Sequence, residues 1–395
     1  MFVRVPLDPP EPEFPIMKYA KDFFLQESAF LFGTFTTVLF YLFSDVLLAG
    51  LAPDLKTVAL FLWIFATMLW CSFGVVRHAD FLAEQLGEPY GTLILTLSVI
   101  SIEVSLIASI MLSGANEPTL ARDTMFAVLM IVLNGMVGIT LLIGGLKHRE
   151  QHYNLQGAKA FLAVLVTLSV LTLVLPKVTV STPLPTFTPY QEVFFATITI
   201  LLYGVFLGIQ TVRHKGLFLQ PGERAQTPHR AAESEAGKRV DHLEVRSVLY
   251  HAVLLLLTML PVVLLSKKLA LFVDFGIEGM GAPVALGGLI IAILVLTPEG
   301  IGALHAARAN QLQRSVNILL GSALATIGLT VPAVLTISLV IDRYVELGLN
   351  DVETLLLLLT LAVSALTFTG GRTNILQGAL HLVLFFAYVF LIFNP

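Results

Sequence analysis

Charged side chains are scarce in this sequence: Asp, Glu, Lys and Arg make up 13% of its 395 residues, whereas 56% of the residues are hydrophobic. Soluble domains carry about 25% charged residues, and a single soluble core would not bury so large an apolar share. The mean hydropathy of +0.86 agrees with this reading. The composition therefore predicts an all-α polytopic membrane protein whose main surroundings are the lipid bilayer.

Other scarcities exclude further classes of protein. The single cysteine, Cys71, excludes an internal disulfide and a cysteine-based metal cluster, and its apolar surroundings predict a small packing residue. No basic stripe with interleaved aromatic residues is present, so no nucleic-acid partner is expected. The N-terminus lacks a basic segment directly before an apolar run and is interrupted by prolines, so we expect no cleavable signal peptide.

Eleven apolar segments are long enough to cross a bilayer, because a helix needs roughly 20 apolar residues to span the hydrocarbon core. The predicted spans are 28–48, 57–76, 91–114, 122–146, 157–176, 192–212, 248–266, 283–306, 312–341, 353–370 and 373–393. The ninth is long enough to tilt, or to bend near Gly328 and Pro332.

The segment 214–246 is polar, mixed in charge and poor in large apolar residues, which predicts a flexible linker with a short helix around 230–239.

Of the 23 Lys and Arg residues, 17 fall on the side of the N-terminus and this linker. This bias places the N-terminus and the linker in the cytoplasm and the C-terminus outside, as expected for a multi-pass protein of the cytoplasmic (inner) membrane. The six on the outer side are Lys56, Arg122, Lys177, Lys267, Lys268 and Arg343. Lys267 and Lys268 follow the seventh predicted span, where snorkelling to the interface is their expected role.

The two halves of the chain repeat the same order of features. Residues 1–50 hold an N-terminal segment and a first helix, 51–213 a set of five helices, 214–246 the linker and 247–395 a second set of five. Because five is odd, the two sets run in opposite directions through the membrane. Arg122 precedes Asn134 by twelve residues, as Arg314 precedes Thr326 in the second set. This order predicts two inverted five-helix repeats with a site at their interface.

Glu103 and Glu299 lie on the second helix of their respective sets, each inside an apolar span. A charged side chain at that depth costs about 2.5–3.5 kcal/mol or more, so it marks a functional site by default. The bland alternative, a protonated carboxylic acid bonded to a neighbouring helix, is less favoured for two acids at corresponding positions. We therefore predict that these two residues bind cations and protons, and that they are the metal ligands.

Neutral oxygens near these acids are further candidate ligands. Pro298 and Gly300 are expected to free carbonyl oxygens near Thr297, and Ser101 precedes Glu103, although on a different face of an unbroken helix. Asn134, Ser322 and Thr326 supply oxygens on the adjacent helices, where bonding across helices is the alternative use. No organic cofactor is predicted.

Burial disfavours the ionised form of a carboxyl group, so both acids are expected to hold protons when no cation is bound. Two protons, one Ca²⁺ or two Na⁺ neutralise the pair equally well, and carboxylates suit Ca²⁺. Because proton and cation exclude each other, such a site couples their movements. The pattern predicts a secondary transporter rather than an enzyme, and it leaves a homo-oligomer open.

Several segments resemble one family. LTLSVISIEVSLIASIMLSG and LARDTMFAVLMIVLNGMVGITLLIGGLKHREQ resemble the first repeat of ChaA-type calcium/sodium:proton antiporters, in the cation/Ca²⁺ exchanger superfamily. LVLTPEGIGALHAARANQLQRSVNILLGSALATIGLTVP resembles their second repeat, and TFTGGRTNILQGALHLVLFFAYVFLIF their tail. The resemblance covers roughly residue 79 to the C-terminus. It implies exchange of a cytoplasmic cation for external protons, an inverted 5+5 architecture after one extra helix, and the repeat glutamates at Glu103 and Glu299, with the repeat asparagine at Asn134.

The sequence departs from the family in one respect. The Gly-Asn-Ala-x-Glu form of many calcium/proton members is absent before both glutamates, which leaves the choice among Ca²⁺, Na⁺ and K⁺ open.

A passive cation channel is the alternative function within transport. An intramembrane enzyme with Glu299 as general base would need a partner motif, and HExxH, GxSxG and cysteine-based motifs are absent. A purely structural membrane protein gives no reason for paired buried acids.

Overall fold

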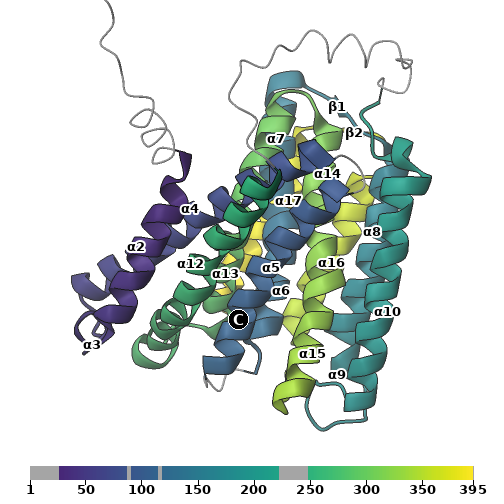
Figure 1. Cartoon of the computed structure of the whole chain (residues 1–395). Helices are drawn as coiled ribbons and strands as arrows, with labels where there is room; N and C mark the ends of the chain where they lie inside the picture. Colours follow the sequence, from purple (N-terminus) through teal and green to yellow (C-terminus); the bar gives the residue numbers. More distant parts are fainter. Residues whose placement is uncertain (1–25, 87–89, 114–117, 222–247, 395) are drawn as a thin grey trace, which may run out of the picture.

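The structure is a computed structural model that describes residues 26–86, 90–113, 118–221 and 248–394. Within these ranges nearly every element is a helix (Figure 1). The helix expected around 230–239 lies outside the described residues.

The first part of the chain forms α2 (Ser28–Leu42), α3 (Ser44–Leu47), α4 (Leu55–Leu86), α5 (Tyr90–Ser113), α6 (Leu120–Met130), η1 (Ile131–Met136), α7 (Val137–His148), β1 (Gln151–His152), α8 (Leu155–Ser169), η2 (Val170–Val174), α9 (Leu175–Val178), α10 (Pro189–Gly208), η3 (Ile209–Arg213) and η4 (Lys215–Leu217). The second part forms α12 (Val248–Asp274), η6 (Phe275–Gly279), α13 (Val284–Arg308), α14 (Leu312–Ala325), η7 (Thr326–Thr330), α15 (Val331–Ile341), α16 (Asp351–Thr367), β2 (Arg372–Thr373) and α17 (Ile375–Phe393).

Eight helices of the described chain are long and apolar enough to cross a membrane. Each overlaps one of the predicted spans, and two of them, Val284–Arg308 and Ile375–Phe393, begin one and two residues later than predicted. The three remaining predicted spans coincide with α2, α5 and α16, which are shorter helices or less completely described ones. The described chain is therefore consistent with the eleven predicted spans, and the protein is a multi-pass helical membrane protein.

Polar side chains fix where several of these helices begin. Thr188 and Asn350 start α10 and α16, and Asn374 starts α17, each with a capping box in which the cap side chain and the third helical residue satisfy each other's backbone donors. Asn154 caps α8 with its side-chain oxygen. These caps end the loops and set the entry of each helix into the apolar layer.

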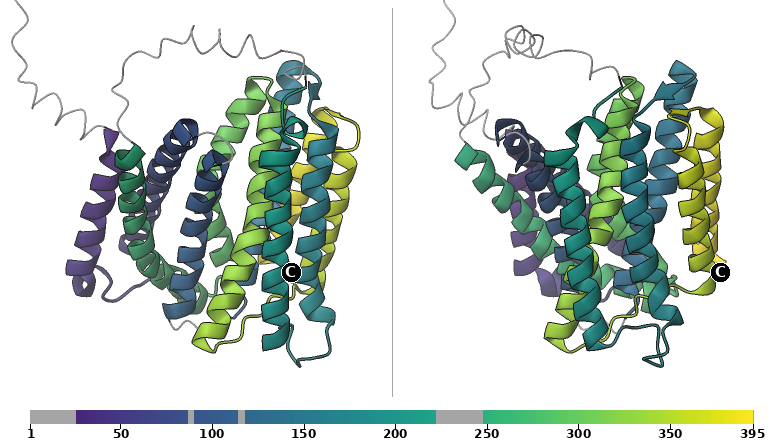
Figure 2. Two further views of the ribbon diagram at one scale, coloured as in Figure 1. Left: turned by 45° about the vertical axis from the view of Figure 1, so that its right-hand side comes forward. Right: turned by 90° about the vertical axis from the view of Figure 1, so that its right-hand side faces the viewer.

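The helices run side by side in one bundle (Figures 1 and 2). The extra first helix, α2, lies at one edge of the bundle and packs against α4 and α12. One cluster of buried side chains joins α2, α4, α5, α12 and α13, and a larger cluster fills the rest of the bundle. The short antiparallel pair of β1 and β2 joins two loops at one end of the bundle, with Gln151 opposite Thr373.

Two helices extend past their predicted ends. α4 runs to Leu86 rather than to residue 76, and α12 runs to Asp274 rather than to residue 266. Lys267 and Lys268 therefore lie inside α12 and do not follow its end. The Lys268 ammonium donates to the Ser44 hydroxyl at 2.9 Å and lies 4.7 Å from the centre of the Tyr41 ring. Hydropathy could not reveal this extension, because a charged residue ends an apolar segment but does not end a helix.

Candidate functional site

Glu103 lies on the middle of α5, an unbroken helix between its described ends, and its side chain is 1% exposed. The Thr326 hydroxyl donates a hydrogen bond to Glu103 Oε2 at 2.9 Å. Thr330, one turn further on, also lies beside this carboxyl. Glu103 Oε1 has no hydrogen-bond partner in the described part of the chain. One carboxylate oxygen of Glu103 is thus held by a hydrogen bond, and the other is not.

Glu299 lies on α13 and lines a cavity. The Ser322 hydroxyl interacts with its carboxyl, while Glu299 Oε2 has no hydrogen-bond partner among the described residues. α13 continues through Pro298, so the proline removes one backbone donor without ending the helix. Glu103 and Glu299 are close enough to interact electrostatically. The structure therefore brings the two predicted acids together.

One face of the third helix of the second half serves both acids. Ser322 and Thr326 are four residues apart, so their side chains lie one above the other on the same face of α14 and η7. Ser322 faces Glu299, and Thr326 faces Glu103. This arrangement brings together four of the predicted site residues.

The third helices of the two halves share a local irregularity. Asn134 lies in the π-helix η1, and Thr326 begins the π-helix η7. A π-helical turn inserts an extra residue, leaves backbone groups less regularly paired and is frequent at functional sites. The two irregular turns overlap when residues are matched by the spacing from Arg122 and Arg314. The sequence indicated a bend near Gly328, and η7 contains that residue.

Asn134 is buried but is bound to helices other than those of the two acids. Its amide nitrogen donates to the Thr360 hydroxyl at 2.8 Å, and its amide oxygen lies 3.3 Å from His381 Nδ1. The other ring nitrogen of His381 lies 3.0 Å from the Thr367 hydroxyl. Sequence reasoning missed Thr360 and His381, although a histidine and a threonine inside apolar runs were a signal for polar partners. A ligand role for Asn134 stays a prediction.

Ser101 and Thr297 bond within their own helices. The Ser101 hydroxyl donates to the Leu97 carbonyl at 2.6 Å, and the Thr297 hydroxyl donates to the Ile293 carbonyl at 2.5 Å. Such bonds to the preceding turn satisfy a hydroxyl without any neighbouring helix. Each oxygen keeps a lone pair, so the predicted ligand roles of both residues remain untested.

A cavity of about 510 Å³ leads from one end of the bundle to Glu299. Charged side chains at its mouth come from three separate elements: Asp80 on α4, Lys215 on η4 and Arg314 on α14. Its lining also includes Val76, Thr96, Val99, Ile100, Tyr203, Phe206, Leu207, Gln210, Thr211, Phe218, Leu219, Pro298, Gly302, Asn317, Ile318, Gly321, Ser322 and Ala325. Glu299 and Ser322 line this cavity, and Glu103 is not among its lining residues.

The other end of the bundle is tied together. The Arg122 side chain pairs with Asp123 at 2.8 Å and donates to the Gly348 carbonyl at 3.1 Å. The Glu346 amide donates to the Pro118 carbonyl at 3.0 Å, which joins the same two loops. These contacts hold the start of α6 against the loop that follows α15, at the end of the bundle away from the lining residues Lys215 and Arg314.

In the described ranges, no group of three or more His, Cys, Asp or Glu residues is placed to hold a metal ion. A cation at Glu103 and Glu299 would therefore draw its remaining ligands from hydroxyl, carbonyl or water oxygens.

Comparison with known proteins places these features in a family. The model of the sodium/calcium exchanger protein family matches residues 56–212 and again residues 250–394. The chain belongs to this family. It is 41% identical over 359 residues to the sodium-potassium/proton antiporter ChaA of Escherichia coli strain K12, covering 86% of this chain and 94% of that protein. The protein is accordingly a membrane transporter of the antiporter class and not an enzyme.

Two solved structures share the fold. The structure of native YfkE superposes with a TM-score of 0.69 at 18% identity, covering 93% of this chain and all of that one. The H⁺/Ca²⁺ exchanger CAX superposes with a TM-score of 0.63 at 15% identity, covering 93% of this chain and 89% of that one. At these identities the similarity establishes the fold and leaves the transported ion open.

Proposed function

We propose that this protein is a secondary active cation:proton antiporter that exchanges a cytoplasmic cation for external protons by alternating access. Glu103 and Glu299 are the shared cation and proton sites. The observation that carries the proposal is that both acids lie together inside the bundle, each with a carboxylate oxygen that has no partner in the described structure. A cavity is lined by Glu299, and contacts of Arg122 tie α6 to the loop after α15 at the other end of the bundle.

The coupling follows from charge neutralisation. Two ionised carboxyls inside a bilayer are costly, so the loaded protein carries either protons or a cation there. Thr326 and Ser322 hold the two groups in place in either state. The same two carboxyl groups bind either the cation or the protons. A site with both carboxyls ionised and no cation bound is too costly to move between the two sides of the membrane. Movement therefore occurs with one ion or the other bound.

Monovalent cations are the favoured cargo. Ca²⁺ takes six to eight oxygen ligands, and here the side chains offered beside the two carboxyls are hydroxyls, while the carboxamide of Asn134 is bonded elsewhere. The E. coli relative at 41% identity is named a sodium-potassium/proton antiporter. We therefore rank Na⁺ and K⁺ ahead of Ca²⁺ as the ions exchanged for protons.

The same proposal covers architecture and location. Residues 51–213 and 247–395 form two inverted five-helix repeats after an N-terminal segment and first helix in residues 1–50, and 214–246 is a cytoplasmic linker. The two separate matches of the family model support this division. The excess of Lys and Arg near the linker supports an inner-membrane protein whose cavity opens to the cytoplasm and whose C-terminus lies outside.

Everted membrane vesicles test the proposal directly. A proton gradient is formed by respiration, Na⁺, K⁺ or Ca²⁺ is added, and the release of protons is followed with a pH-sensitive dye. Glu103→Gln and Glu299→Gln should each abolish the response, because an amide cannot exchange a proton. Glu150→Gln is the matched control, since Glu150 forms an exposed pair with Arg372. Full exchange by the Glu103→Gln protein would refute the site.

The channel alternative makes a different expectation. A channel conducts cations without a pH gradient, whereas an exchanger moves them only against protons. The relative at 41% identity, named a sodium-potassium/proton antiporter, favours exchange. Cation-dependent current in a planar bilayer at equal pH on both sides would instead support a channel.

A further inference from the structure

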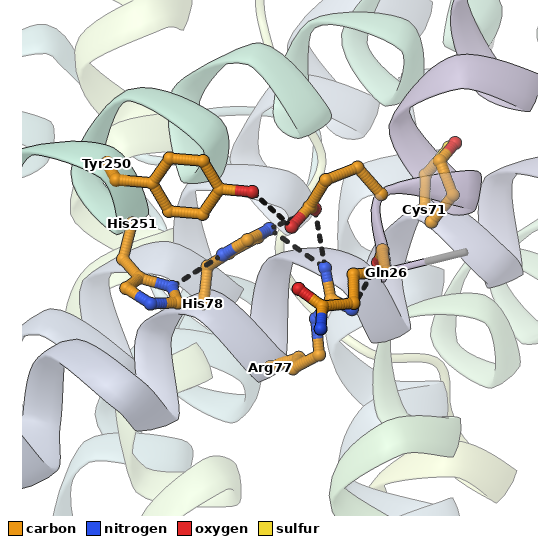
Figure 3. A network of polar contacts seen from close by, with 8 residues as sticks. Gln26, Cys71, Arg77, His78, Tyr250 and His251 are labelled. Atoms are coloured by element: carbon orange, nitrogen blue, oxygen red, sulfur yellow. Dashed lines mark hydrogen bonds and ion pairs between the residues drawn. The ribbon is translucent and has the colours of Figure 1, made fainter. Parts of the chain in front are cut away.

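A second group of titratable residues, separate from the transport acids, lies where three helices meet. Figure 3 shows His78 of α4 between Arg77 on one side and His251 and Tyr250 of α12 on the other. Glu27, the residue before α2, lies in the same network: its Oε1 accepts from the Tyr250 hydroxyl at 2.7 Å, and its Oε2 lies 3.1 Å from His78 Nε2. His78 is 1% exposed and His251 8%.

Glu27 lies on one side of His78. Burial alone would raise the pKa of Glu27, but hydrogen bonds with His78 and Tyr250 and the charge of Arg77 lower it to about 2. The carboxylate is therefore ionised at neutral pH and can only accept. Arg77 Nη2 also donates to Glu27 Oε2, at 2.6 Å. Arg77 and His78 therefore both lie against the same carboxylate oxygen of Glu27. Arg77 Nη2 also lies 3.1 Å from His78 Nε2, and a proton on this nitrogen lets His78 donate to Glu27.

The other side of His78 meets a second imidazole. His78 Nδ1 and His251 Nδ1 are 3.0 Å apart, a hydrogen-bond distance between two nitrogens. Such a contact needs a hydrogen on one nitrogen and a lone pair on the other. It is satisfied when both rings are neutral, and it is strengthened when the pair carries one positive charge beside Glu27. A second added proton places two N–H groups face to face, and the contact is lost.

Three helices contribute polar groups around the pair within the described part of the chain. Glu27 faces it from the residue before α2, Arg77 from α4 and Tyr250 from α12, and the Phe81 ring stacks on His251 with ring centres 4.6 Å apart. A neighbouring pocket lined by Arg77 and Phe81 also holds titratable groups, which are Asp80, Glu84 and His305. Histidine is the side-chain type whose ordinary charge change falls between about pH 5 and 8. The contact between the two rings is therefore the part of this network best suited to binding a proton.

The His78–His251 pair lies next to the wall of the cavity. Val76 and Asp80, on either side of His78 in the sequence, both line the cavity that leads to Glu299. α4 packs extensively on α12, and these helices come from the two parts of the chain that the family model matches separately. A change in the contact between His78 and His251 therefore acts on the packing of α4 at the cavity mouth.

We propose that the His78–His251 pair is a proton-binding site separate from the transport acids, which joins α4 to α12 until a second proton enters it and slows exchange when that proton binds. The proposal rests on the proposed function and on the proposed orientation. An antiporter that brings protons into the cell acidifies the cytoplasm as it works. A cytoplasmic proton site that loosens the cavity wall at acid pH limits that acidification.

His251→Gln tests the site. Glutamine can accept or donate toward His78 Nδ1 but does not titrate in this range, so the contact persists at all pH values. Initial rates of Na⁺-driven proton release are measured in everted vesicles with the exposed, cytoplasmic pH set between 5.5 and 8 at a constant pH gradient. At pH values below the pKa of a single group, a rate that depends on the unprotonated form falls about tenfold per pH unit. We expect the wild-type rate to fall about tenfold more than the His251→Gln rate between pH 7 and 5.5.

Two control variants separate a proton site from a merely structural contact. Tyr250→Phe removes the hydrogen bond to Glu27 and keeps both histidines, so it should keep the wild-type pH profile. His152→Gln removes an exposed histidine on β1 and should also leave the profile unchanged. If Tyr250→Phe flattens the profile as His251→Gln does, or if His251→Gln keeps the wild-type profile, the proposal is wrong. Loss of exchange at every pH in Glu103→Gln, together with an altered profile only in His251→Gln, distinguishes this site from the transport site.

Hydrogen–deuterium exchange gives a readout that does not depend on transport. Purified wild-type and His251→Gln proteins are compared at the same pH, so intrinsic exchange rates cancel. We expect amides in the first turns of α12 to exchange several-fold faster in the wild type at pH 5.5 and equally in both proteins at pH 7.5. Equal exchange at both pH values would overturn the proposal even if the variant proved inactive.

Discussion

Thr326 connects the two halves of the chain at the level of a single hydrogen bond, from its hydroxyl to Glu103 Oε2. Both groups are buried, and the other oxygen of Glu103 has no partner in the described structure. A hydroxyl that can rotate serves either a carboxylate or a bound cation. Removal of the Thr326 hydroxyl should therefore destabilise the cation-loaded state of the site more than the protonated state.

We expect Thr326→Val to weaken cation binding and Thr326→Ser to preserve it. Hydrogen bonds to charged groups contribute about 1.5–3 kcal/mol, which corresponds to roughly a 10- to 100-fold change in affinity. The apparent KM for Na⁺ in everted vesicles should rise by about that factor in Thr326→Val, since valine keeps the shape and lacks the oxygen. Thr326→Ser is the matched control. An unchanged KM in Thr326→Val would show that this hydroxyl is not part of the site.

Glu27 allows an expectation about stability and pH. Its folded-state pKa of about 2 lies below the ordinary value of 4.5 because of its bonds with His78 and Tyr250 and the Arg77 charge, despite its burial. A depressed pKa contributes stability that is present above pH 4.5 and is lost as the pH falls toward 2. The melting temperature of Glu27→Gln in detergent should be lower than that of the wild type above about pH 5. The difference should shrink below that pH, and a constant difference would contradict this account.

Part of the site could be predicted from the sequence residue by residue. Glu103 and Glu299 stand out because an acid inside an apolar run has a large cost, and the matched spacing pointed to Thr326. The partners of Asn134 could not be predicted, because Thr360 and His381 lie more than 200 residues away in the chain. The contact between His78 and His251 was also missed. Both residues lie at the ends of predicted spans, where polar residues are expected and do not indicate a site.

At the scale of elements, hydropathy located the eight long apolar helices of the described chain, because every span must satisfy its own backbone polar groups. It did not reveal where α4 and α12 end, nor the π-helical turns η1 and η7, because those depend on packing between helices. In η7, a Cβ at Gly328 would lie 2.6 Å from the Tyr203 ring. Glycine there allows α10 to approach the irregular turn that carries Thr326.

Gly288 has a similar role where α13 crosses α6. A Cβ built on Gly288 would lie 2.6 to 2.8 Å from backbone atoms of Asp123 and Thr124, which cannot turn aside as a flexible side chain can. Overpacking costs about 1–3 kcal/mol, so we expect Gly288→Ala to lower the melting temperature in detergent by several degrees. Gly302→Ala on the same helix is the control, because its nearest neighbour is Ile318 Cδ1 at 3.9 Å. Equal melting temperatures for the two variants would mean that the helices adjust at this crossing.

At the scale of the whole molecule, the two ends of the described structure differ. The cavity that Glu299 lines, with Lys215 and Arg314, lies toward the end that carries the β1–β2 pair, while Arg122 ties α6 to the loop after α15 at the far end. The charge bias of the sequence predicts which end faces the cytoplasm, but no sequence pattern predicts which end is open. That depends on how the helices of the two halves tilt against each other, and an exchanger must adopt both arrangements.

Single cysteines at the two ends of α10 and η3 would reveal both the orientation and the open side. Gln210 lines the cavity, and Tyr190 is 91% exposed at the opposite end. In a Cys71→Ala background, a membrane-impermeant thiol reagent should label Gln210→Cys in everted vesicles and Tyr190→Cys in right-side-out vesicles. Bound Na⁺ or a lower pH should change the rate of labelling at Gln210→Cys only, because exchange alters the exposure of the cavity. Labelling of Gln210→Cys from the outside alone would reverse the proposed orientation.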